Sequence, residues 1–138
     1  ILTGYYAQQV RRDILPGIKG GRSVRPAWAP LVTEYLKHDG YQNYHSGKWH
    51  IDGKVLPNGF HQSWRVNNQG DFFSAKGNLL NDIPFAPEEA PKNYYSTTAT
   101  ASHGIKCLKA HAKDYRDKPF FHYLLSSLPT SRFMPRKM

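Results

Sequence analysis

The sequence feature that most constrains the fold is a predicted helix followed directly by a predicted strand. This pair occurs twice. The first pair occupies residues 30–46. Pro30 suits the first turn of a helix, where its missing N–H is not needed, and Gly40 suits a left-handed stop. The aromatic segment from Tyr41 to Ser46 then predicts a strand. One face of this helix is expected to be apolar: Leu31, Val32, Tyr35 and Leu36.

The second pair begins with a predicted helix over residues 98–116. Gly104 lies inside it and Lys118-Pro119 ends it. The continuous apolar run 120–125 then predicts a strand that is buried on both faces. The helix is expected to bury one stripe of apolar residues: Ala101, Ile105, Leu108, Ala112 and Tyr115.

Two segments are predicted to be irregular. Glycines and prolines punctuate residues 14–26, and residues 53–93 are rich in Gly, Asn, Pro and Asp. The whole pattern predicts an α/β fold with a parallel or mixed sheet, flanking helices and long loops. In such sheets, sites form beyond the carboxyl ends of the strands.

The formal charge of +9 favours an anionic partner. Nucleic acid and phosphorylated or sulfated molecules are candidates, but no nucleic-acid-binding motif accompanies the scattered basic residues, so we do not expect nucleic acid. No apolar run is long enough to predict a membrane span. The single cysteine, Cys107, excludes an internal disulfide and reads as a small buried residue of the second helix.

The segment 47–50 (Gly-Lys-Trp-His) carries the most chemistry. It follows the first predicted strand, and if it is extended, Lys48 and His50 point the same way. A lysine supplies a compact positive charge for a tetrahedral anion, and a histidine can donate a hydrogen bond or shuttle a proton. Such a pair can stabilise charge that develops on a leaving oxygen.

Residues 47–50 resemble the lysine–histidine signature of the sulfatase family. Residues 2–6 (Leu-Thr-Gly-Tyr-Tyr) are similar to the family's Leu-Thr-Gly-x-Tyr, which follows its nucleophile motif. Residues 58–61 (Asn-Gly-Phe-His) are similar to its Gly-Phe-Asp, with His61 in place of the acid. Residues 118–121 (Lys-Pro-Phe-Phe) resemble its Pro-Phe-Phe strand. The four motifs occur in the family's order and span most of the chain.

The resemblance implies an arylsulfatase-type hydrolase with an alkaline-phosphatase-like fold. It also implies a divalent cation, Ca²⁺ or Mg²⁺, and a formylglycine nucleophile made from Cys or Ser. Lys48 would contact the sulfate and the nucleophile, and His50 would hydrogen-bond the nucleophile's hydroxyl. The substrate would be a sulfated sugar, polysaccharide or aryl alcohol. Because the family is commonly exported, a periplasmic or secreted location is expected.

The chain starts at Ile1 rather than Met, so we expect an internal fragment. The nucleophile motif, Cys or Ser-x-Pro-x-Arg, would come just before Ile1, and the family's metal-binding aspartates also fall outside the chain. We therefore expect no metal ligands here and no activity of the chain alone. Two alternatives stay open: an inert remnant, or a phosphatase or phosphodiesterase of the same fold.

We expect the other histidines to have structural roles rather than catalytic ones. We expect His61 in a loop and His122 as a hydrogen-bonded core residue of the last strand. His45 could suggest zinc together with His50, but no cysteine or further histidine completes such a set. Three histidines on the predicted helices are expected at the surface: His38, His103 and His111.

The chain divides into a partial sulfatase domain, residues 1–124, and a tail, residues 125–138. The family continues after its Pro-Phe-Phe strand with a segment containing Ala-Pro-His, whereas Thr130 stands at the histidine position here. Synonymous codons for the family-like segment, read with one base dropped, encode this tail. We therefore expect a shift of reading frame near Leu125, and a disordered tail; the alternative is a divergent member with Thr130 in that place.

Overall fold

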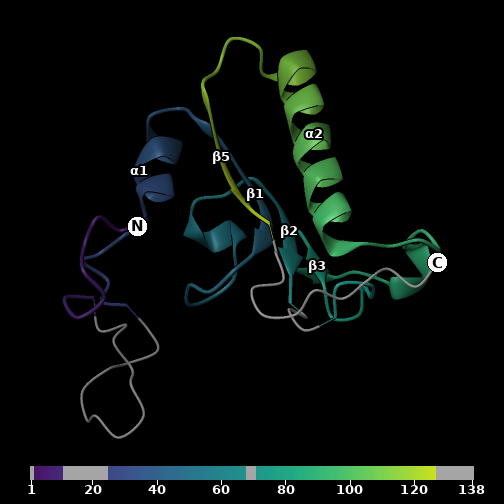
Figure 1. Cartoon of the computed structure of the whole chain (residues 1–138). Helices are drawn as coiled ribbons and strands as arrows, with labels where there is room; N and C mark the ends of the chain where they lie inside the picture. The colour runs from purple at the N-terminus through teal and green to yellow at the C-terminus, as the bar shows by residue number, and fades with distance from the viewer. Residues whose placement is uncertain (1, 11–24, 68–70, 127–138) are drawn as a thin grey trace, which may run out of the picture.

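Five strands form one mixed sheet in the order β4-β3-β2-β1-β5 (Figure 1). The structure is a computed structural model that describes residues 2–10, 25–67 and 71–126. Most of the predicted loop 14–26 and of the tail 125–138 therefore lies outside the described residues. The strands are β1 (Gln42–Lys48), β2 (Gln62–Val66), β3 (Leu79–Leu80), β4 (Ile83–Pro84) and β5 (Phe120–Leu125).

Strand β1 is the centre of the parallel part of the sheet. It pairs in parallel with β2, where Ser46 lies opposite Trp64, and with β5, where Ser46 lies opposite Leu124. β3 and β4 extend the sheet as antiparallel strands beyond β2. The prediction of an α/β fold with a parallel or mixed sheet is therefore confirmed at the level of fold class, and the sheet is mixed.

The two α-helices, α1 (Val32–His38) and α2 (Ser96–Asp114), approach opposite faces of β1 (Figure 1). The side chain of Asn43 donates a hydrogen bond to the carbonyl of Thr33 in α1 at 2.8 Å. The hydroxyl of its neighbour Tyr44 lies 3.0 Å from Nδ1 of His111 in α2. Consecutive strand residues point to opposite faces, which explains this division. No helix within the described ranges is long and apolar enough to cross a membrane.

Helix α1 lies where it was expected, with differences at its start and on its buried face. Pro30 precedes the N-cap residue, Leu31, instead of lying in the first turn. Gly40 has φ +84°, as predicted for a left-handed stop. Tyr35 is exposed although it was placed on the apolar face. Thr33 is buried instead, because its hydroxyl donates a 2.6 Å hydrogen bond to the carbonyl of Asn58.

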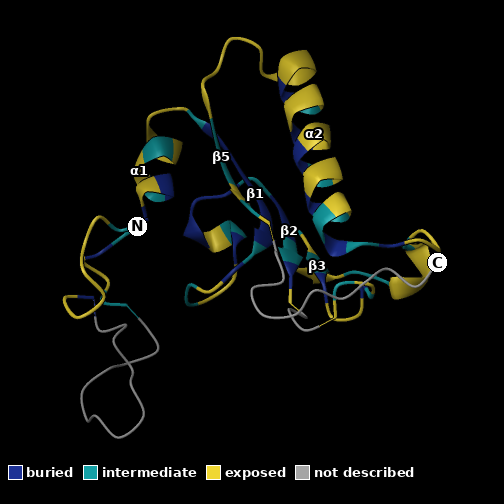
Figure 2. Ribbon diagram, viewed as in Figure 1, coloured by how far each residue is buried: buried dark blue, intermediate teal, exposed yellow. Residues whose placement is uncertain are grey.

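The prediction for the buried face of α2 is wrong. The apolar stripe that the sequence suggested faces solvent, and Ile105 is 54 % exposed (Figure 2). Gly104 faces the sheet, where a Cβ atom would lie 3.0 Å from Cδ1 of Leu124. The helix therefore approaches the strands too closely for a stripe of large side chains. The buried positions are mostly small or polar: Ser96, Thr100, Gly104, Cys107 and His111.

Two further predictions about strands are corrected. Residues 53–93 are not only loops, because they contain β2, β3, β4 and two short 3₁₀ helices, η1 (Leu56–Asn58) and η2 (Pro87–Glu89). Strand β5 has the predicted bounds but lies at the edge of the sheet. Phe120 and Leu124 are therefore about half exposed rather than buried. Leu125, the first residue of the predicted tail, is the last residue of β5.

Candidate functional site

Lys48 and His50 lie at the carboxyl end of the central parallel strand. Lys48 is the last residue of β1 and is half-buried, and His50 follows two residues later and is exposed. The place agrees with the expectation that a site forms beyond the carboxyl ends of parallel strands. Whether these two side chains act on a substrate stays a prediction.

Trp49 separates the two candidate side chains and anchors them. Its ring packs edge-on against His45 at 5.2 Å and against Phe60 at 5.7 Å between ring centroids. Its indole N–H donates a 3.2 Å hydrogen bond to the carbonyl of Gly53. With 4 % of its surface exposed, Trp49 fixes the backbone on either side of it. Its neighbours Lys48 and His50 are both more accessible than Trp49.

Gly47 allows the chain to bend just before Lys48. Its φ is +116°, a value that side-chain-bearing residues rarely adopt. A Cβ atom at this position would overlap the carbonyl oxygen of Leu125 on β5 and would lie 3.2 Å from Cγ2 of Thr100 on α2. The glycine therefore permits β1, β5 and α2 to meet at the end of the strand.

His45 holds the backbone of Lys48 from inside the sheet. Its Nε2 lies 3.2 Å from the carbonyl oxygen of Lys48, so Nε2 carries the proton and donates. Its Nδ1 is buried without a hydrogen-bond partner among the described residues. The ring of His45 is fully buried. His45 therefore holds the backbone of the candidate site from within the core.

An arginine network fixes the loop that follows the site. The guanidinium group of Arg25 donates to Asp52 at 3.2 Å, to Glu34 at 3.0 Å and to Asn58 at 2.7 Å. Its Nε donates to the carbonyl of Ala29 at 2.9 Å. The role of Arg25 is not visible in the sequence, because its side-chain partners lie 27, 9 and 33 residues away along the chain.

The four motifs that resemble sulfatases meet in one hydrophobic cluster. Leu2, Trp49 and Phe60 are buried in it, and Phe121 packs against it. Each residue comes from a different motif, and the motifs are separated by up to about a hundred residues of chain. The cluster thus brings residues 2–6 to the same part of the fold as Lys48 and His50.

Histidines on the other face of β1 form a second buried polar group. The hydroxyl of Ser46 lies 2.7 Å from Nδ1 of His103 and 3.0 Å from Nε2 of His122. The hydrogen-bonded role predicted for His122 is confirmed. The surface positions predicted for His103 and His111 are wrong, because they face the sheet, and Nε2 of His111 donates to the carbonyl of Lys118. Polar strand residues that need partners explain this inward placement.

The remaining single-residue predictions have clear outcomes. His38 is exposed at the end of α1, and Cys107 is buried in α2, both as predicted. His61 precedes β2, and its Nδ1 accepts a 3.0 Å hydrogen bond from the backbone N–H of Asn43. His61 therefore helps to join the start of β1 to the loop before β2.

A resident cation does not fit the residues that the structure describes. Within these ranges no group of three or more His, Cys, Asp or Glu side chains is placed to hold a metal ion. Zinc ligated by His45 and His50 is not supported, because two histidines do not complete a zinc site and no third ligand joins them among the described residues. We therefore derive no chemical step through a metal at Lys48 and His50.

The fold and the site together define an α/β domain in which Lys48 and His50 lie at the carboxyl end of the central parallel strand, β1. No family model matches the chain, and no curated protein matches it.

Acid is expected to destabilise the fold through its buried histidines. Burial lowers the pKa of His45 and of His103 to about 4, whereas both have pKa values near 6.5 when unfolded. The unfolded chain therefore binds more protons between these values, so the free energy of unfolding falls as pH drops from about 6.5 to about 4. We expect a loss on the order of 3 kcal/mol from each of these two groups.

Urea unfolding followed by circular dichroism across this pH range measures the loss. His103→Gln should flatten the dependence, and His38→Gln, at an exposed position, should leave it unchanged. Equal pH dependence in the parent and in His103→Gln would contradict the assignment.

Proposed function

We propose that this chain is part of a sulfatase, an arylsulfatase-type hydrolase of sulfate monoesters. Lys48 would contact the sulfate and the nucleophile, and His50 would hydrogen-bond the nucleophile's hydroxyl. The observation that carries the proposal is the convergence of the four motifs on one cluster through Leu2, Trp49, Phe60 and Phe121. The convergence would be unexpected if the motifs had been chance similarities, because each one contributes an apolar anchor to the same core.

The chemistry of the site supports the proposal. A lysine ammonium at the end of a strand can pair with a sulfate oxygen, and a neutral imidazole can donate to or accept from a hydroxyl. The half-buried place of Lys48 strengthens its attraction for an anion relative to a fully solvated lysine. Trp49 keeps the backbone of both residues in place, which reduces the ordering cost of binding.

The finer parts of the proposal follow from the resemblance. The fold would be alkaline-phosphatase-like, the nucleophile a formylglycine, and the cation Ca²⁺ or Mg²⁺ held by residues other than those described. The substrate would be a sulfated sugar, polysaccharide or aryl alcohol, and the location periplasmic or secreted. The chain alone would bind sulfate without turning over an ester.

Sulfate titration of the purified chain tests the role of Lys48. We expect weak, saturable binding that falls about tenfold in Lys48→Ala, because a charge-assisted hydrogen bond is lost. Lys54→Ala is the matched control, since Lys54 is an exposed lysine on the following loop. Isothermal titration calorimetry gives both affinities. The role of Lys48 would be wrong if both variants bound sulfate as the parent does.

Sequencing the encoding DNA on both sides of the chain separates the enzyme classes. Codons for Cys or Ser-x-Pro-x-Arg in frame before Ile1 would support a sulfatase, and a bare Thr or Ser nucleophile would favour a phosphatase or phosphodiesterase. A single-base change near codon 125 that restores Ala-Pro-His would support the frame-shift hypothesis for the tail. A clean frame confined to these codons would favour the inert remnant.

A further inference from the structure

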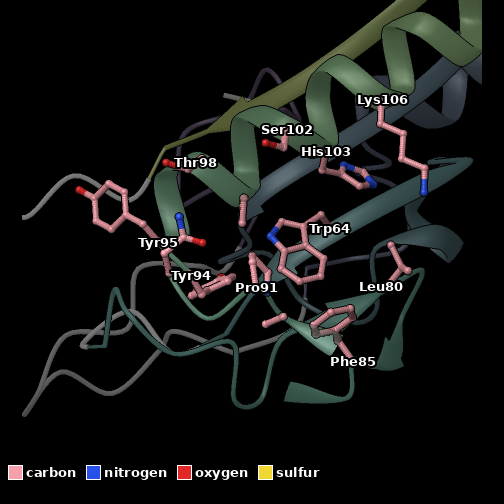
Figure 3. A pocket seen from close by; sticks show the side chains of 13 residues that line it. Trp64, Leu80, Phe85, Pro91, Tyr94, Tyr95, Thr98, Ser102, His103 and Lys106 are labelled. Atoms are coloured by element: carbon pink, nitrogen blue, oxygen red, sulfur yellow. The ribbon is translucent and has the colours of Figure 1, made fainter. Parts of the chain in front are cut away.

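A pocket of about 350 Å³ opens beside α2, on the face of the sheet that α2 covers (Figure 3). The first turns of α2, the strands β2 and β3, and the segment 85–95 enclose it. Its volume falls within the range of about 300–1,000 Å³ that is typical of small-molecule sites. The sequence gives no sign of this pocket, because its walls come from four separate segments.

The walls of the pocket are aromatic and apolar. Trp64 is 6 % exposed, and Phe85 packs edge-on against it at 5.0 Å between ring centroids. The imidazole of His103 lies over the same indole at 6.4 Å, tilted by 31°. Tyr94 and Leu80 also line the pocket. Such walls favour a flat ring, which can stack or pack edge-on against them.

A single cation lies at one end of the pocket. Figure 3 shows the side chain of Lys106 extending from α2 on the side of the pocket near His103 and Leu80. In the part of the chain that the structure describes, no carboxylate forms an ion pair with Lys106. Uncharged polar groups of Ser102, Thr98 and Asn93 also line the cavity.

His103 adds no second charge at neutral pH. Burial, together with smaller contributions from the nearby His122, His45 and Lys106, lowers its pKa to about 4. Its Nδ1 is also engaged by the hydroxyl of Ser46 at 2.7 Å. Lys106 is thus the one side chain lining this described cavity that is charged at neutral pH, which favours a ligand with one negative charge.

We propose that this pocket binds a flat aromatic molecule that carries one anionic group. The ring would lie against Trp64 and Phe85, and the anionic group would pair with Lys106 at the end of the pocket. The inference is independent of the proposed sulfatase function, because it uses neither Lys48 nor His50.

Titration of the full chain with naphthalenesulfonate, and with naphthol as the uncharged comparison, tests the proposal by equilibrium dialysis. We expect saturable binding of the sulfonate, and a roughly fivefold loss of its affinity in Lys106→Met, as for an exposed ion pair. Lys109→Met is the matched control, because Lys109 lies one turn further along α2 and does not line this pocket. Naphthol affinity should be the same in both variants.

Ser102→Phe supplies a second variant that fills the pocket from an exposed position of α2. It should abolish binding of both molecules while circular dichroism shows an intact fold. Undiminished binding in this folded variant would overturn the proposal, since the ligand would then lie elsewhere. Equal losses in Lys106→Met and Lys109→Met, or no saturable binding of the sulfonate, would also overturn it.

Discussion

Replacing Gly47 by alanine should destabilise the fold by more than about 4 kcal/mol, enough to leave much of the chain unfolded. Two costs add at this position. The backbone has φ +116°, which disfavours any side chain, and the added Cβ would overlap the carbonyl oxygen of Leu125. That carbonyl belongs to a neighbouring strand, so relief requires β5 to move away from β1.

Comparison with Gly77→Ala separates the cost of backbone strain from the cost of the Cβ overlap. Gly77 also has a positive φ, +80°, but a Cβ there would meet no atom within 4 Å. We expect it to cost only about 1 kcal/mol, from backbone strain alone. Urea unfolding measured by circular dichroism gives both free energies. Similar losses in the two variants would show that the contact between Gly47 and β5 is not tight.

Trp49→Ala should lower the free energy of unfolding by about 3–5 kcal/mol, the usual cost of removing a large buried ring. The change would leave a cavity between His45 and Phe60 and would remove the hydrogen bond to the carbonyl of Gly53. Because Trp49 lies between Lys48 and His50, the same variant should also weaken sulfate binding if the proposed function is right.

Trp28→Ala is the matched control for the loss of an indole. Trp28 is 59 % exposed, and its ring contact with Tyr5 lies at the surface. We expect it to cost less than about 1 kcal/mol. The same urea measurement applies, and a loss in Trp28→Ala as large as in Trp49→Ala would contradict the anchoring role of Trp49.

Strong local signals in the sequence predicted both α-helices and the strands β1 and β5, but none of the short elements between β1 and α2. The apolar run of β5 has the same bounds in the sequence and in the structure, and Gly40 ends α1 as expected. These features depend on neighbouring residues alone. Strand β2 was missed because its five residues stand within a segment dominated by Gly, Asn and Pro, and its pairing with β1 supplies what local propensity lacks.

The orientation of α2 shows where local patterns fail. Its apolar stripe predicted one buried face, but Gly104 and Cys107 face the sheet instead. Ser46 and Tyr44 point from β1 toward the helix and need hydrogen-bond partners, which His103 and His111 provide. Periodicity reports apolar spacing only, so it could not predict a polar interface between a helix and a strand.

By itself, the sequence determined the α/β class, the positions of the strongest helices and strands, and the candidate pair Lys48 and His50. It could do so because turn residues, apolar runs and short motifs act over a few neighbouring positions. Only the tertiary structure decided that Trp49 anchors that pair and that Arg25 fixes the loop beyond it. Those contacts join residues far apart in the chain, and close packing and hydrogen-bond satisfaction select them only once the sheet has formed.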